Sequence, residues 1–123
     1  MSWKVSHIAN QNGKVYEIKT LSLKQTNSYI GTTHQKMKVA KKHLDLLYER
    51  RANLMNEPVE KGKAQRKIFE NLQFKEKKMN WSISNADEGA RIKAIVLMAL
   101  KHLENGADIS LIEAILNQAR DEE

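Results

Sequence analysis

The sequence predicts a mostly α-helical α+β protein in which an N-terminal β-hairpin packs on four helical segments. Three observations lead to this fold class. An Asn12-Gly13 pair, typical of hairpin turns, separates two short stretches in which apolar and polar residues alternate. Apolar residues then recur at spacings of three and four along the later segments, which is the helical pattern. Asn105-Gly106 separates the last two of these segments, so we expect them to form an antiparallel helix pair.

The length and composition fit one domain. The chain has 123 residues, of which 41% are hydrophobic and 29% charged. A chain of this length can bury a core without a disulfide or a metal ion. We therefore predict a single domain over 1–123. Its parts are a β-hairpin and connection over 1–31, a basic helical region over 32–84 and an acidic helical hairpin over 85–123.

The register of the hairpin follows from a two-residue turn at Asn12-Gly13. The numbers of paired residues then sum to 25, which places His7 opposite Ile18. This register gathers mostly apolar side chains on one face, which we expect to pack on the helices because a lone hairpin is marginally stable. That face carries Trp3, Val5, His7, Ala9, Tyr16, Ile18 and Thr20.

The first helix is expected to begin at Thr32. Gln35 follows three residues later, which is the capping-box pattern. An apolar stripe at helical spacing continues from there for about six turns. Pro58 ends the helix, because the residue before a proline avoids helical angles. Residues 22–31 are interpreted as a connection, with a short strand at 28–30 left open.

Three further elements follow Pro58. A second helix is expected over 60–78, and the alternation over 79–83 predicts either a third strand or an extended linker held by Trp81. Asn85 and Asp108 stand where they would cap the last two helices. The helix after Asn85 is apolar almost all round and is therefore expected to be central. The predicted core includes Ile95, Val96, Leu100 and Ile112.

Positive charge is concentrated in the first two thirds of the chain. Residues 1–84 contain 17 Lys and Arg against 7 Asp and Glu, a net charge of +10, whereas residues 85–123 contain 4 against 8, a net charge of −4. A basic region favours a polyanionic partner, because each phosphate that a cation neutralises releases counterions. The cations assigned to nucleic-acid binding are Lys36, Lys38, Lys41, Lys42, Arg50, Arg51, Lys61, Lys63, Arg66, Lys67, Lys75, Lys77 and Lys78. A solvated helix face with local ion pairs explains the same charges without a ligand.

Aromatic side chains leave two interpretations open. Trp3, Tyr16, Phe74 and Trp81 would provide stacking surfaces for bases if they are exposed. If they are buried, they are anchors of the core.

Several functional classes have no support in the residues. Cysteine is absent, which excludes disulfides, thiolate metal sites and cysteine nucleophiles. The histidines His7, His34, His43 and His102 include no pair four residues apart, the spacing of a helical metal site. No glycine-rich phosphate loop or nucleophile elbow occurs, so we expect no enzyme, metal or cofactor. No apolar run is long enough for a signal peptide or a membrane span, so a cytoplasmic location is expected.

The sequence thus predicts a small non-enzymatic accessory protein that binds the backbone of DNA or RNA without strong sequence specificity. By association, the composition suggests a protein of a mobile element or a phage. The alternative is a protein-interaction module, such as an inhibitor, adaptor or small subunit, that docks on an acidic protein surface.

Overall fold

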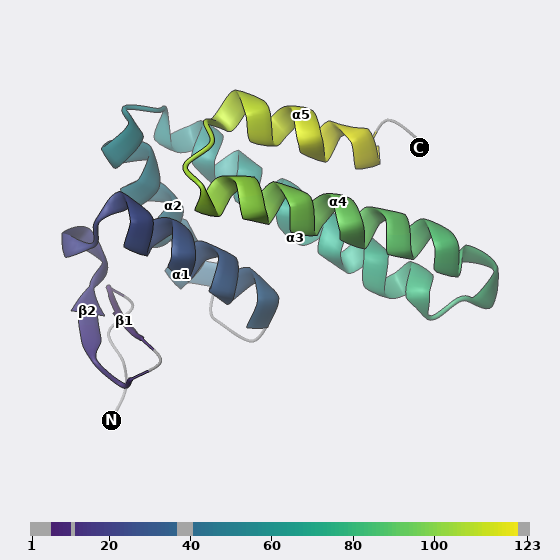
Figure 1. The fold of residues 1–123 in the computed structure, drawn as a ribbon, viewed down its shortest axis with the longest axis horizontal. Coiled ribbons are helices and arrows are strands. Elements are labelled where there is room, and N and C mark those ends of the chain that lie inside the picture. The colour runs from purple at the N-terminus through teal and green to yellow at the C-terminus, as the bar shows by residue number, and fades with distance from the viewer. Residues whose placement is uncertain (1–5, 11, 37–40, 121–123) are drawn as a thin grey trace.

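The fold consists of a short N-terminal β-hairpin followed by helices that pack around one core (Figure 1). The computed structural model describes residues 6–10, 12–36 and 41–120. Within these ranges the order is β1 (His7–Ala9), β2 (Val15–Glu17), the 3₁₀ helix η1 (Ile18–Thr20), α1 (Leu23–Lys36), α2 (Lys41–Met55), α3 (Val59–Asn80), the 3₁₀ helix η2 (Ile83–Asn85), α4 (Ala86–Glu104) and α5 (Ile109–Arg120). The predicted class, α+β and mostly α, is confirmed.

The hairpin forms, but in a different register from the predicted one. Ile8 pairs with Tyr16, and His7 pairs with Glu17 rather than with Ile18. The backbone amide of Asn10 donates to the carbonyl of Lys14, so the loop holds three residues instead of two. Gly13 has a φ of +77°, as expected for the last position of such a loop.

The side chain of Asn10 explains why the longer loop is preferred. Its Oδ1 accepts hydrogen bonds from the backbone amides of Asn12 at 2.9 Å and Lys14 at 3.0 Å, which fixes the turn locally. The shift by one residue places Ile8 and Tyr16 against the core, whereas His7 turns to the opposite face with Glu17. Trp3 and Val5, which were predicted to share the core face, lie outside the described residues.

The first helix is capped at Ser22, ten residues before the predicted Thr32, because a different capping box is used. The Ser22 amide donates to Gln25 Oε1 at 3.0 Å, and the Gln25 amide donates to Ser22 Oγ at 3.2 Å. Residues 22–31 are therefore not a connection or a strand. Thr32 lies inside α1, where its hydroxyl donates to the carbonyl of Ser28.

The predicted long helix from Thr32 to Pro58 is wrong for a related reason. Its first part belongs to the end of α1, and α2 occupies Lys41–Met55, with residues 37–40 outside the described part of the chain. Leu44 and Leu47 are buried as the apolar stripe predicts.

The third predicted strand is absent as well, because α3 continues to Asn80 and η2 follows at Ile83–Asn85. Met79 lies on the apolar side of α3 and packs against the core. The alternation of apolar and polar residues over 79–83 therefore does not correspond to a strand. Trp81 does not hold a linker in place, because its side chain is 89% exposed.

The C-terminal helix pair forms as predicted, although Asn85, which was expected to cap α4, makes no side-chain capping hydrogen bond. Gly106 has a φ of +85° at the end of α4, and Asp108 Oδ1 accepts the Leu111 amide at 2.8 Å. Ile95, Val96, Leu100 and Ile112 are all buried. The α4 helix packs against α1, α3 and α5 and is central to the fold, although Leu97 and Met98 on its surface are about half exposed.

In Figure 1 the long helices α3 and α4 lie side by side and extend beyond α1 and α5 at the end where η2 joins them. The hairpin lies at the opposite end of the long axis. The last turns of α3 and the first turns of α4 thus form a projecting two-helix arm with Trp81 and η2 at its tip.

Candidate nucleic-acid interface

The α3 helix carries most of the cations assigned to nucleic-acid binding. Their orientation follows from which side of the helix packs against the core. Gly62, Gln65, Phe69 and Leu72 are buried at helical spacing. At Gly62 the contact is especially close, because an added Cβ would lie 3.4 Å from the carbonyl oxygen of Tyr48 on α2. With this face against α2 and α4, the opposite side of α3 must be in solvent.

Between Lys63 and Trp81, five residues share that opposite side and form what we call the outer face of α3; the exposed Glu60 lies in the same sector one turn before Lys63. At about 100° per residue they lie within a sector of about 60°. All five are exposed. They are Lys63, Lys67, Phe74, Lys78 and Trp81.

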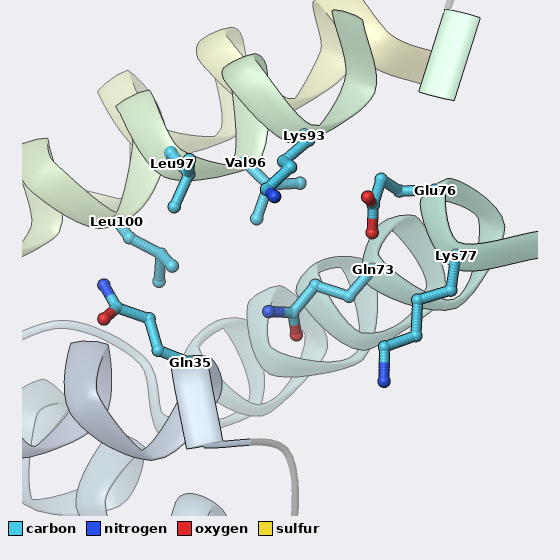
Figure 2. A pocket seen from close by; sticks show the side chains of 8 residues that line it. All are labelled: Gln35, Gln73, Glu76, Lys77, Lys93, Val96, Leu97 and Leu100. Carbon is cyan, nitrogen blue, oxygen red and sulfur yellow. The ribbon is translucent and has the colours of Figure 1, made fainter. Parts of the chain in front are cut away.

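The two glutamates between Lys63 and Trp81 differ in position, because Glu76 lies on another side of the helix whereas Glu70 lies only about 20° outside the outer face. Glu70 pairs with Arg66, and Glu76 lines a hollow toward α4 (Figure 2). The exposed charge of the outer face is therefore positive over about 27 Å of helix, at 1.5 Å per residue.

The predicted lysines keep their side chains in solvent, with few exceptions. Exposed positions are Lys41, Lys42, Lys61, Lys63, Lys67, Lys77 and Lys78. Lys75 is half-buried and takes part in interactions within the protein. Lys38 lies outside the described residues, and Lys36 ends α1 with a side chain that is not described.

Arg51 is not part of a binding surface, contrary to the prediction. Its side chain is 1% exposed. Nε donates to Asn27 Oδ1 at 3.1 Å, Nη1 donates to Glu57 Oε1 at 3.3 Å, and Nη2 donates to the carbonyl of Ala107. Glu57 Oε2 in turn accepts the Ile109 amide at 2.8 Å. This buried network joins α1, α2 and the start of α5.

Arg66 and Arg50 are structural residues as well. Arg66 is 6% exposed and pairs with Asp45 at 2.5 Å and with Glu70 at 2.7 Å. Arg50 donates two hydrogen bonds to the carbonyl of Leu21, at 3.0 and 2.8 Å. The three predicted arginines therefore hold helices together, because a guanidinium offers several donors that a backbone or carboxylate oxygen can accept.

Two adjoining hollows border α3 on either side of Lys77. The larger, of about 410 Å³, lies between α1, α2 and α3, and Lys41, Phe74 and Lys77 are among its lining residues. The smaller, of about 290 Å³, lies between the end of α1, α3 and α4 and includes Lys77 and Lys93 (Figure 2). Figure 2 shows Val96, Leu97 and Leu100 forming its apolar wall on α4.

His34 lines the larger hollow and is buried. Its Nε2 lies 2.8 Å from the hydroxyl of Tyr48, and its ring packs against Phe69. Burial lowers the pKa of His34 from 6.5 to about 4, with Gln73 and Glu70 opposing the shift. Within the described residues its Nδ1 has no hydrogen-bond partner.

The described residues include no group of three or more potential ligands that could hold a metal ion. No described helix combines the length and apolarity that crossing a membrane requires. The outer face of α3 presents ammonium groups and exposed aromatic rings. Comparisons with protein-family models, with curated proteins and with solved structures found no match.

Sequence reasoning missed two features of this surface. Lys93 was not assigned, because its proximity to Lys77 depends on the packing of α4 against α3. Phe74 and Trp81 were named only as conditional stacking residues. Their spacing of seven within a lysine-rich helix, equal to about two turns, was the available signal that they share a face.

Proposed function

We propose that this protein binds nucleic acid without strong sequence specificity through the outer face of α3. The observation that carries the proposal is the row of exposed lysines on that face from Lys63 to Lys78, where Glu70 is paired with Arg66 and Glu76 lies on another side of the helix. Lys41 and Lys77 extend the same positive surface around the larger hollow. Ammonium groups in such a row suit phosphates at successive positions along a strand.

The roles of the arginines support the lack of sequence specificity. Arginine is the residue that most often reads guanine, by a bidentate contact. The four arginines whose side chains the structure describes are all engaged in contacts within the protein: Arg50, Arg51, Arg66 and Arg91. The cations left for a ligand are lysines, which bind phosphate as point charges.

The proposal includes a non-enzymatic role and a cytoplasmic location. The lack of a catalytic motif in the sequence is the basis for the first, and the lack of a long apolar run is the basis for the second. The partner would be the backbone of DNA or RNA.

A protein partner with an acidic surface is the second candidate. The observation that favours it is the exposure of Phe74 and Trp81, because aromatic residues are enriched where protein interfaces are energetically important. This candidate predicts little affinity for nucleic acid at physiological salt and one specific protein in a pull-down.

The test is a salt titration of binding to DNA and RNA with Lys63, Lys67 and Lys78 replaced together by Gln. If each lysine contacts one phosphate, the slope of log K against log salt should flatten by up to about 2.7 for duplex DNA and about 2.1 for a single strand. Arg66 is left in place because its replacement would break the buried ion pairs with Asp45 and Glu70.

A matched control removes the same charge from other elements. Lys19 on η1, Lys24 on α1 and Lys101 on α4 are exposed, and their joint replacement by Gln should change the slope much less. Equal effects of the two triple variants would show that net charge, and not the outer face of α3, drives binding. Failure of the unaltered protein to bind any nucleic acid at micromolar concentration in low salt would refute the proposed function.

A further inference from the structure

The outer face carries two aromatic side chains that are largely exposed to solvent. Phe74 is 70% exposed and Trp81 is 89% exposed. The core side of the same helix already has its own aromatic and aliphatic residues, Phe69 and Leu72, which are buried. Phe74 and Trp81 therefore contribute little to folding, and a large ring in water is costly unless another role retains it.

The geometry of α3 places both rings on one line. They are seven residues apart, which is about 20° short of two full turns. Helical angles continue through Trp81, whose φ is −80° and ψ is −14°, so the alignment holds at the end of the helix. The two positions are separated by about 10.5 Å along the axis.

Lysine side chains lie between and beside the Phe74 and Trp81 rings. Lys78 lies on the same face between Phe74 and Trp81, and Lys77 is its neighbour at the border of both hollows. The separation of about 10.5 Å corresponds to about three steps of a stacked strand, at about 3.4 Å per nucleotide. A ring, a cation and a second ring thus follow one another at a spacing that a short stretch of nucleotides can match.

From this arrangement, and resting on the proposed function, we infer that the ligand is single-stranded nucleic acid, whose unpaired bases stack on Phe74 and Trp81 while Lys77 and Lys78 bind the phosphates. The bases of a duplex are already stacked on one another, so a duplex could reach the same lysines but not the rings. Stacking tolerates any base, because every base has a π-face.

The larger hollow gives a base at Phe74 room to lie beside the helix. Phe74 and Lys41 belong to its lining, as does His34 with its unpartnered Nδ1. A base that stacks on Phe74 would then have a phosphate-binding lysine on each side, Lys41 from α2 and Lys77 from α3.

An anionic membrane surface fits the outer face less well. A helix that lies in a membrane interface needs a continuous apolar side to insert. The continuous apolar side of α3 is buried in the core, and on the outer face lysines interrupt the two rings. Isolated rings among cations are the arrangement typical of single-strand binding surfaces.

The experiment uses Trp81 as its own reporter. The chain has two tryptophans, so Trp3→Phe leaves Trp81 as the single indole. This protein is titrated in low salt with a 20-nucleotide oligo-dT and with a 20-base-pair duplex, and fluorescence of Trp81 and anisotropy of the labelled nucleic acid are recorded. We expect quenching with oligo-dT, weak quenching with the duplex and tighter binding of oligo-dT.

Variants then separate stacking from charge. Phe74→Leu, and Trp81→Leu in the unaltered chain, should each weaken oligo-dT binding by about 5- to 150-fold, the range for loss of one stacked base, with little effect on the duplex. Phe74→Tyr should retain binding. Met98→Ala and Leu111→Ala remove exposed apolar groups of α4 and α5 and should leave binding unchanged, while thermal melting checks that every variant is folded.

Results that contradict the inference can be told apart from results that contradict the proposed function. Equal affinity for oligo-dT and duplex, with no loss in either leucine variant, overturns the inference and leaves backbone binding by lysine intact. Absence of binding to both nucleic acids overturns the proposed function as well. A blue shift of Trp81 emission with anionic phosphatidylglycerol vesicles, together with no quenching by oligo-dT, would assign the two rings to a membrane surface and also overturns the inference.

Discussion

Protonation of His34 should destabilise the fold as the pH falls from about 6.5 to about 4. Its ring is 2% exposed, and it contacts the hydroxyl of Tyr48 and the ring of Phe69. The pKa in the folded protein is lowered to about 4 by burial, whereas in the unfolded chain it should lie near 6.5. Between these two values the unfolded chain binds a proton and the folded protein does not, so stability is lost as the pH falls.

The size of this loss follows from the difference between the two pKa values. A shift of about 2.5 pH units at about 1.36 kcal/mol per unit gives a maximum of about 3.4 kcal/mol. About 2 kcal/mol of this should be lost between pH 7.5 and 5, and about 3 kcal/mol by pH 4. Domains are typically stable by about 5–15 kcal/mol, so the loss should be readily measured.

Chemical denaturation from pH 7.5 to 4 tests this, comparing the unaltered protein with His34→Gln. Other groups titrate in the same range, and the difference between the two proteins cancels their contribution. The variant is expected to be less stable at pH 7.5 but to lose about 3 kcal/mol less on acidification. Parallel pH profiles for the two proteins would show that His34 does not stay neutral in the folded state and would refute the reasoning.

Two further predictions concern stability at neutral pH. Arg51→Met should cost about 3–5 kcal/mol in denaturant unfolding, because it removes the guanidinium from the buried Asn27 and from the partly buried Glu57 carboxylate and Ala107 carbonyl; a loss under about 1 kcal/mol would mean that water replaces the guanidinium. Leu100→Ala should cost about 2–5 kcal/mol, because Leu100 is buried in the centre of α4, and an unchanged melting temperature would contradict the central position of that helix.

The C-terminal helix pair could be predicted from local signals alone. Gly106 ends α4 and Asp108 caps α5, and each acts within one helical turn of its own position. The buried apolar residues of α4 recur at the helical spacing. The N-terminal half contained competing local signals. Ser22-Gln25 and Thr32-Gln35 are equivalent capping patterns, and only packing of the residues between them decides which one starts the helix.

The sequence predicted that the candidate site is basic, but not which of its cations are exposed. A lysine and an arginine count equally in a charge map, yet Arg51 and Arg66 are buried partners of carboxylates, whereas Lys63 and Lys67 are in solvent. Those partners are supplied by folding, since Asn27 and Ala107 are 24 and 56 residues away from Arg51 in the chain. No pattern within a window of the sequence could separate the two roles.

The hydrogen bonds of Arg51 also affect which parts of the protein can unfold locally. Their acceptors come from α1, from the segment after α2 and from the connection between α4 and α5. If the C-terminal helix pair detached by itself, the guanidinium would lose an acceptor inside a largely dry environment, which costs more than the loss of contact area. Partial opening at that place is therefore penalised, and slow amide exchange in α1, α2 and α5 should be lost together, as one cooperative unit.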